Sequence, residues 1–145
     1  MKKIGRIILI LIAVLVVLFL VIQFLPIGKD HTNPPVLSEP NWDTPATREL
    51  AQHACFDCHS NETVWPWYSK IAPVSWLIWF DVQEGRARMN FSEWKDGGSQ
   101  DIGEIVEILQ EGEMPPFQYL LMHPEARLSQ ADKQALITGF QNSIP

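Results

Sequence analysis

Apolar residues are distributed very unevenly along this 145-residue chain. The longest apolar run, residues 7–25, contains no charged side chain. As a helix rising 1.5 Å per residue, this run would be about 28 Å long, close to the hydrocarbon thickness of a bilayer. We therefore expect residues 1–25 to form an N-terminal membrane anchor that contacts the lipid through residues 4–25.

The charges on either side of this run predict its orientation. Lys2, Lys3 and Arg6 precede the run, whereas Lys29 is offset by Asp30 on the other side. The positive-inside rule then predicts a single-pass protein of the inner membrane whose C-terminal domain is periplasmic. A cleaved signal peptide is the alternative. It usually has a shorter apolar core that ends at small residues, and residues 21–26 offer no such site.

A proline-rich segment follows the expected anchor. Five prolines fall within twenty residues, which favours an extended, polyproline-like backbone over a packed core. We expect residues 26–43 to be a linker and residues 44–145 to be one small domain, because the remaining length does not suffice for two. The prolines are Pro26, Pro34, Pro35, Pro40 and Pro45.

The pattern beyond the linker is helical. Thr44 can cap a helix that begins with Pro45, and Ser129 can cap another with Asp132 three residues later. One segment carries apolar residues at the i, i+3, i+4, i+7 spacing of a single buried stripe, and no segment alternates as a strand does. The sequence predicts an all-α domain with helices at about 46–56, 73–88, 101–111 and 129–141.

Composition narrows the possible functions. The whole chain has a formal charge of −6, and residues 41–145 carry seven basic and fifteen acidic side chains. Nucleic acid is therefore not expected as a partner, because binding phosphates needs clustered Lys and Arg. The two cysteines are too few for a disulfide scaffold or a four-cysteine zinc site. Motifs for nucleotide binding or serine hydrolysis are absent.

The most informative motif is Cys55-Phe56-Asp57-Cys58-His59. A C-x-x-C-H run is the attachment signature of haem c. Positions three and four apart share one face of a helix, so both thiols and the imidazole can face one haem. The predicted cofactor is one covalent haem c, with its iron bound by His59. An exported domain fits this prediction.

Three other interpretations compete with haem. A thioredoxin-like dithiol needs a βαβ context, which the pattern does not predict. A zinc site needs about four ligands, which Cys55, Cys58, His59 and His53 supply only poorly. A chance match is the third interpretation.

The second axial ligand of the iron must come from elsewhere in the chain. We favour Met114, which follows a predicted helix and precedes two prolines that stiffen the backbone. A thioether opposite an imidazole raises the reduction potential relative to two histidines. His123 is our second choice. The remaining candidates are Met89, Met122, His31 and His53.

The chain also resembles a known family, the bacterial haem-binding domain family of c-type cytochrome-like proteins. The resemblance covers nearly all of residues 44–142. It implies a cytochrome c-like helical fold with one haem held by Cys55 and Cys58 and ligated by His59. In that fold the distal methionine precedes the last helix, where Met114 lies, and the first and last helices cross closely, which Gly139 would allow. The matching segments are residues 55–68 and 71–76, Gly85-Arg86, Asn90-Phe91-Ser92, Met114-Pro115-Pro116, Tyr119, His123-Pro124 and Leu128-Ser129.

Other residues suit a haem environment less specifically. Arg86 and Arg88 are rare cations in this acidic domain, and Arg86, with Asn90 as a further donor, is a candidate partner for the haem propionates. The alternative is that the two arginines simply belong to a solvated helix end. Tryptophans at 65, 67, 76, 79 and 94 could contact haem or simply pack the core.

An acidic helix face completes the set of candidate features. Its residues could steer a redox partner with a basic docking face, or merely be solvated. The preferred hypothesis is one-electron transfer by an anchored cytochrome. The alternatives are a peroxidase-like or oxidase-associated haem enzyme and a non-catalytic haem sensor. The residues of the acidic face are Glu104, Glu107, Glu111 and Glu113.

Overall fold

The structure is a computed structural model that describes residues 2–94 and 101–144. The chain divides into two compact units. The first unit consists of residues 1–31 and 65–80, and the second of residues 32–64 and 81–145. Within the described residues there is no β-strand, and the one isolated bridge joins Ser38 to Glu93. The all-α prediction is confirmed.

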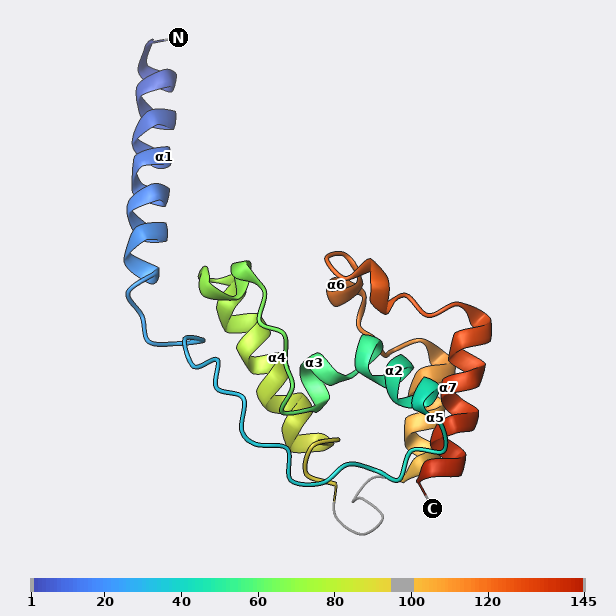
Figure 1. The fold of residues 1–145 in the computed structure, drawn as a ribbon. Helices are drawn as coiled ribbons and strands as arrows, with labels where there is room; N and C mark the ends of the chain where they lie inside the picture. The colour runs from blue at the N-terminus through green and yellow to red at the C-terminus, as the bar shows by residue number, and fades with distance from the viewer. Residues whose placement is uncertain (1, 95–100, 145) are drawn as a thin grey trace. The chain divides into compact units, whose positions relative to one another are not determined.

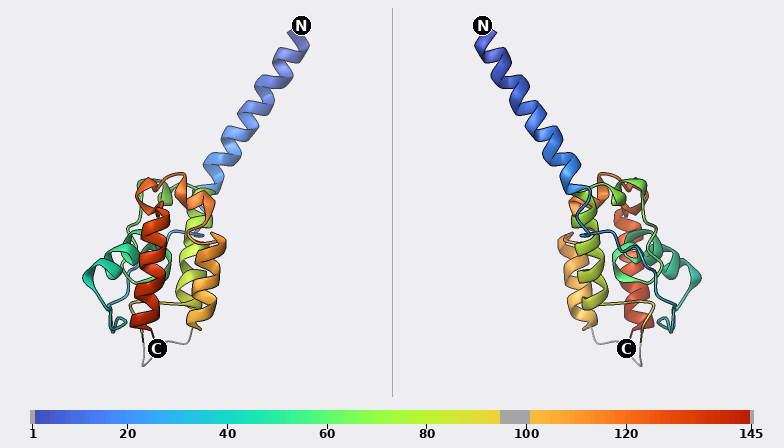
Figure 2. Two further views of the ribbon diagram at one scale, coloured as in Figure 1. Left: turned by 90° about the vertical axis from the view of Figure 1, so that its right-hand side faces the viewer. Right: turned by 90° about the vertical axis from the view of Figure 1, so that its left-hand side faces the viewer.

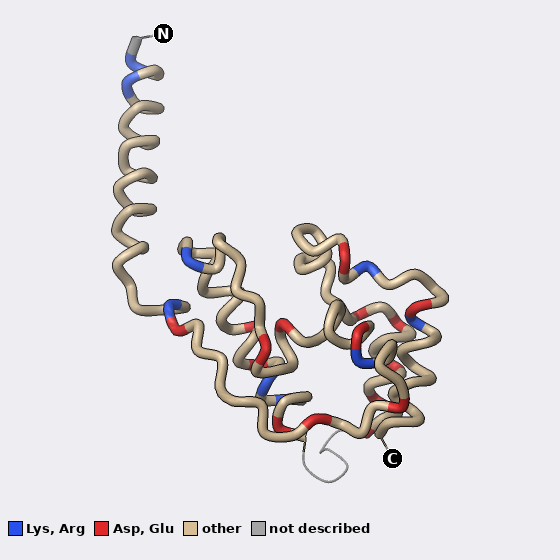
Figure 3. The backbone as a smooth tube through the Cα atoms, in the orientation of Figure 1, with Lys and Arg blue, Asp and Glu red and all other residues tan. Residues whose placement is uncertain are grey.

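The first unit contains the long apolar helix α1 (Lys2–Ile22), the 3₁₀ helix η1 (Trp67–Lys70) and the beginning of α4 (Val74–Arg88) (Figure 1). The most apolar 18-residue stretch within residues 3–22 has a mean hydropathy of 3.2, and residues 3–21 are exposed. Within α1, the basic residues all lie near its N-terminal end (Figure 3). By length and composition α1 is able to cross a membrane, a test that signal sequences also pass.

The second unit is a small helical bundle. Helices α2 and α5 both pack against α7 (Figures 1 and 2). The unit also contains a short helix, α3, directly after α2, and two short elements between α5 and α7. The bounds are α2 (Pro45–Ala54), α3 (Phe56–His59), α5 (Ile102–Glu111), α6 (Phe117–Leu120), η2 (Pro124–Ala126) and α7 (Gln130–Ser143).

Aromatic rings form the centre of the second unit. Phe91 is fully buried and stacks on Phe56 and Phe140, with ring centroids 5.4 and 5.8 Å apart, respectively. Trp94 also stacks on Phe91, and the Trp42 ring packs against Phe91 at a tilted angle. Burying these large apolar surfaces stabilises the unit. These ring contacts also join α3 and α7 to the non-helical segments around residues 42 and 91.

The helix ends follow the sequence signals. The Thr44 side chain accepts a hydrogen bond from the Thr47 amide at 3.2 Å, and Pro45 is the first residue of α2. Ser129 and Asp132 form a reciprocal capping box at the start of α7. Gly112 ends α5 with φ +76°, a left-handed conformation that glycine adopts without strain. These contacts explain why the predicted boundaries agree with the structure to within one or two residues.

Two features differ from the sequence expectation. The predicted helix 46–56 is interrupted at Cys55, whose φ of −126° ends α2 and starts the separate turn α3. The second half of the expected linker is also held in place. The amides of Leu37 and Ser38 donate to the Ser92 carbonyl at 2.8 and 3.2 Å. The predicted domain boundary at residue 44 stays a prediction.

The crossing of α2 and α7 depends on Gly139. A Cβ added at this position would lie 2.9 Å from the Cβ of Thr47 and closer still to the other atoms of that side chain. A glycine inside a helix is normally less stable than alanine by about 0.5–1 kcal/mol. At position 139 the close contact with Thr47 makes glycine the more stabilising of the two residues.

We therefore expect Gly139→Ala to lower the free energy of unfolding by about 1–3 kcal/mol, as overpacking does in other cores. Chemical denaturation followed by circular dichroism measures this change. Gly103→Ala is the matched control, because the nearest atom to its added Cβ is the adjustable carboxylate of Asp101 at 3.1 Å. Equal stability of the two variants would contradict the close crossing.

Candidate functional site

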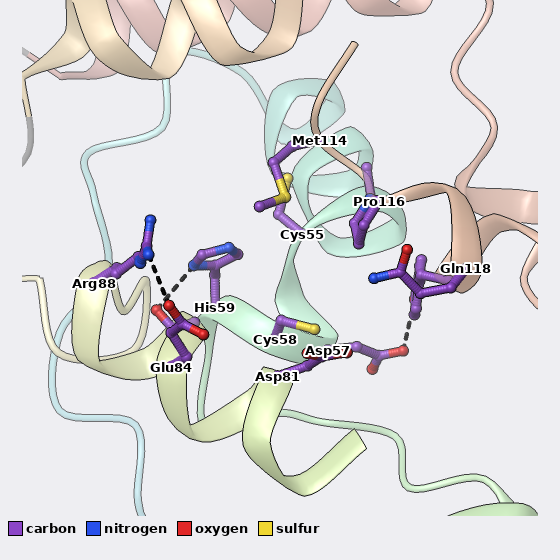
Figure 4. A pocket seen from close by; sticks show the side chains of 13 residues that line it. Cys55, Asp57, Cys58, His59, Asp81, Glu84, Arg88, Met114, Pro116 and Gln118 are labelled. Carbon is purple, nitrogen blue, oxygen red and sulfur yellow. Dashed lines mark hydrogen bonds and ion pairs between the residues drawn. The ribbon is translucent and has the colours of Figure 1, made fainter. Parts of the chain in front are cut away.

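A cavity of about 210 Å³ lies within the second unit. Three segments surround it: the end of α2 with α3, the second half of α4, and residues 114–119 (Figure 4). Cysteine, histidine and methionine side chains from the sequence motifs meet here. The lining residues are Ala54, Cys55, Asp57, Cys58, His59, Asp81, Glu84, Gly85, Arg88, Met114, Pro116, Gln118 and Tyr119.

The C-x-x-C-H motif forms one wall of the cavity. The Cys55 carbonyl accepts hydrogen bonds from the amides of Cys58 at 3.2 Å and His59 at 2.9 Å. This single helical turn brings both thiols and the imidazole to the same cavity, although the turn does not continue α2. The two intervening residues differ in role, because Phe56 is buried in the core whereas Asp57 lines the cavity.

Helix α4 forms the wall next to this motif, and Gly85 allows the close approach. A Cβ at residue 85 would lie 2.9 Å from the Cys58 carbonyl carbon and 3.0 Å from the Cys58 Cβ. The absence of a side chain at position 85 therefore lets α4 touch the backbone of α3. No local sequence signal explains a glycine inside this helix.

The approach of α4 fixes the protonation of His59. The Nδ1 atom lies 3.0 Å from the Gly85 carbonyl oxygen and 3.2 Å from that of Met89. Carbonyl oxygens can only accept, so Nδ1 must carry the proton and donate to them. The lone pair of the neutral ring is then on Nε2. Burial lowers the pKa of His59, which favours this neutral, metal-binding form.

Both thiols are protonated in this environment. Burial, reinforced by Cys58, raises the pKa of Cys55 to about 12. Burial also raises the pKa of Cys58 to about 12, with Asp81 and Asp57 adding to the effect. Dithiol catalysis needs a thiol whose pKa is lowered. The site therefore lacks the electrostatics of a thioredoxin-like pair.

A zinc site is also not assembled. His53, the fourth candidate ligand, is half exposed and lies 3.9 Å from Glu49. Throughout the part of the chain that the structure describes, no group of three or more His, Cys, Asp or Glu side chains is arranged to hold a metal ion.

Met114 is the one residue among the six candidates for the second axial ligand that lines the cavity. Figure 4 shows its thioether and the His59 imidazole reaching into the same space. His123 instead stacks on Tyr119, with ring centroids 3.9 Å apart, and His31 stacks on Trp65 in the first unit. Met122 is largely exposed.

A hydrogen bond that the sequence did not reveal joins the two sides of the site. The Tyr119 hydroxyl donates to Asp57 Oδ2 at 2.7 Å, and the other Asp57 oxygen accepts from the Val64 amide at 2.8 Å. Burial and the neighbouring carboxylate of Asp57 raise the pKa of Tyr119, so its hydroxyl keeps its proton. Because Tyr119 follows the Met114-Pro115-Pro116 segment closely, this bond ties that segment to the motif.

Arg86 and Asn90 do not line the cavity. Arg86 donates to the Ser60 carbonyl at 2.8 Å and the Thr63 hydroxyl at 2.9 Å, while Asn90 donates to the Asn61 side chain at 2.9 Å. These contacts hold together the segment that follows the motif. The cation that does line the cavity is Arg88, which forms an ion pair with Glu84 at 2.7 Å.

The tryptophans are likewise absent from the cavity lining. Trp94 belongs to the core of the second unit, and Trp65, Trp67, Trp76 and Trp79 lie in the first unit. The lining instead includes Asp81 and Glu84, two acidic residues on α4 that sequence reasoning missed. Burial, together with Glu84, raises the pKa of Asp81.

The contact between Gly85 and Cys58 can be tested. We expect Gly85→Ala to lower the free energy of unfolding by about 1–3 kcal/mol, because the added Cβ must push α4 away from α3. Urea unfolding of the two proteins measures the difference. Gln83→Ala, at an exposed position of the same helix, should change stability by less than about 0.5 kcal/mol. A stabilised Gly85→Ala variant would contradict the contact.

Comparison with known proteins agrees with this geometry. The model of the haem-binding domain family matches residues 17–142, which include every lining residue of the cavity. Comparisons with curated proteins and with solved structures give no match. The family match covers most of the chain, and two thiols and a neutral imidazole with a free Nε2 lone pair lie at one cavity. Together these findings identify haem as the ligand. The chain belongs to the haem-binding domain family and is a haem-binding protein.

Proposed function

We propose that this protein is a membrane-anchored, single-haem c-type cytochrome that transfers one electron at a time on the periplasmic side of the inner membrane. The observation that supports this proposal best is the meeting of Cys55, Cys58, His59 and Met114 at one cavity. Two thiols can tether a haem through thioether bonds, and imidazole and thioether can bind its iron.

The residues present fit a covalent haem. The Nε2 lone pair of His59 is available for iron because Nδ1 donates to two carbonyls. The thiols are placed three residues apart, as the attachment motif requires. The cavity of about 210 Å³ is smaller than the roughly 300–1,000 Å³ typical of cofactor sites. A haem would thus need more room than the cavity itself offers, and Met114, which lines the cavity, is 39% exposed.

Each residue has a distinct part in this proposal. Cys55 and Cys58 would hold the haem by adding their thiols to its two vinyl groups, and His59 would bind the iron through Nε2. Met114 would supply a thioether ligand, which would favour Fe(II) and raise the reduction potential. When bound, the haem iron supplies the one-electron couple. The hydrogen bonds from His59 Nδ1 hold the imidazole plane in place and make it a stronger ligand.

The surroundings support an electron carrier rather than an enzyme. If His59 and Met114 both bind the iron, they would leave no coordination position for a substrate. The exposed glutamates of α5 provide negative charge that suits a redox partner with a basic docking face. For the propionates, Arg86 with Asn90 remains our proposal from the sequence, and Arg88 is a further candidate because it lines the cavity. The glutamates of the acidic face that lie on α5 are Glu104, Glu107 and Glu111, and Glu113 follows the helix.

Helix α1 supports the proposed location. It has the length and composition of a membrane span, and Lys2, Lys3 and Arg6 precede its apolar part. The positive-inside rule then leaves the haem domain outside the cytoplasm, where haem c is attached. The acidic domain gives no basis for nucleic-acid binding.

An optical spectrum tests the haem and its ligands together. Protein produced with a haem c maturation system should carry one haem that survives denaturing electrophoresis. Met114→Ala should keep the haem but lower the reduction potential and open the sixth position to carbon monoxide. Met122→Ala is the control, because Met122 is exposed and does not line the cavity.

The outcomes separate the functional classes. A colourless matured chain would overturn the proposal as a whole. Rapid binding of carbon monoxide or peroxide by the unmodified protein would instead indicate a peroxidase-like enzyme or a haem sensor. Equal potentials for the protein and its Met114→Ala variant would exclude Met114 as the ligand.

The Tyr119 hydroxyl provides a second test. Tyr119→Phe removes the hydrogen bond to Asp57 but keeps the ring that stacks on His123. Because the segment carrying Met114 is then tied less firmly, we expect a lower reduction potential and partial loss of thioether ligation in the oxidised spectrum. Spectroelectrochemical titration measures both. Tyr68→Phe, at a tyrosine that does not line the cavity, should leave both unchanged. A purely structural role of Tyr119 would alter stability only.

A further inference from the structure

A segment distant in sequence is tied to the end of α1 within the first unit. The Gln23 side chain follows this helix and pairs with the backbone of Ala72. Its Nε2 donates to the Ala72 carbonyl and its Oε1 accepts from the Ala72 amide, each at 3.0 Å. The same Nε2 donates to the Phe19 carbonyl at 2.9 Å. Both the nitrogen and the oxygen of the Gln23 side-chain amide are therefore hydrogen-bonded to Phe19 or Ala72.

Two further contacts continue this attachment along the chain that leaves α1. Gly28 has φ +68°, and a Cβ there would lie 2.6 Å from the Ser75 carbonyl oxygen, so its backbone packs directly on the start of α4. The His31 ring stacks on Trp65 with centroids 4.4 Å apart. Residues 65–75 therefore lie beside the C-terminal end of α1 (Figures 1 and 2).

The side chains exposed at this position have the chemistry of a membrane interface. Trp67 is 72% exposed and Phe24 is 84% exposed, which is costly for large aromatic groups in water. Ile71 and Leu25 are also exposed, and Lys70 adds a positive charge. Tryptophan gathers at the headgroup level of bilayers, and a lysine there places its charge in the headgroups while its methylene stem stays in apolar surroundings.

We propose that these residues form an interfacial patch that lies in the headgroup layer of the bilayer spanned by α1. The patch consists of Phe24, Leu25, Trp67, Lys70 and Ile71. This inference rests on the membrane anchoring proposed above. The patch contacts lipid rather than protein because it continues directly from the membrane helix. The headgroup layer in which it lies is about 5–7 Å thick on each side of the bilayer.

Photocrosslinking of the full chain in vesicles tests the patch whether or not haem is attached. A benzophenone-bearing phenylalanine replaces Trp67, and lipid adducts on the peptide containing residue 67 are quantified by mass spectrometry. The same probe at Phe80 is the matched control, since this residue is aromatic, 55% exposed and in the same unit. It lies about 9 Å along α4 from Val74, the first residue of that helix, so we expect it to lie beyond the headgroup layer.

We expect roughly tenfold more lipid adduct at residue 67 than at residue 80, because only the former reaches the headgroup layer. A third probe at Phe24 reports on the anchor itself. Adduct at residue 24 but none at residue 67 would overturn the patch while leaving the anchor intact. No adduct at any of the three positions, with the chain removed from vesicles by alkaline carbonate, would overturn both. Equal adduct at residues 67 and 80 would also overturn the patch.

A separate variant tests the hydrogen bonds between the Gln23 side chain and the Ala72 backbone. Gln23→Leu keeps the end of the anchor apolar but removes both hydrogen bonds to Ala72. Lipid adduct at residue 67 should fall several-fold in this variant, while adduct at residue 24 stays unchanged. Undiminished adduct at residue 67 would show that this pairing does not hold the patch at the membrane.

Discussion

The candidate site depends on the contact between α4 and the short helix α3. Gly85 removes the side chain that would keep the two backbones apart, so the carbonyl oxygens of residues 85 and 89 reach the His59 ring. Those two oxygens determine which nitrogen carries the proton. A single missing Cβ therefore decides whether the imidazole presents a lone pair or a hydrogen to the cavity. Without that approach the two thiols would remain, but the tautomer and orientation of the His59 imidazole would not be fixed.

The sequence was informative wherever a feature is encoded locally. The helix in the apolar run and the caps at Thr44 and Ser129 are encoded by residues close together in the sequence, and the structure has them as predicted. The C-x-x-C-H motif and the proline-stiffened Met114 segment were likewise recognisable, and the structure brings them to one cavity.

Features that depend on distant partners were not predictable in the same way. The break at Cys55 interrupts a run of good helix formers, and no local signal marks it. The contacts of residues 37–38 with Ser92 place an apparently free linker against the domain. Arg86 seemed suited to an anionic ligand, yet its guanidinium binds the Ser60 carbonyl and the Thr63 hydroxyl. Asp57 and Tyr119 are sixty-two residues apart, so only the fold reveals their bond.

The two variable positions of the motif have a consequence for protein engineering. Phe56 inserts into the aromatic core, and Asp57 receives the Tyr119 hydroxyl from the far wall. Transplanting the five residues onto the helix of another scaffold would carry over the two thiols and the imidazole alone. Neither the orientation of the imidazole nor the Met114 thioether would be transferred with them, because both depend on residues that the motif itself does not contain.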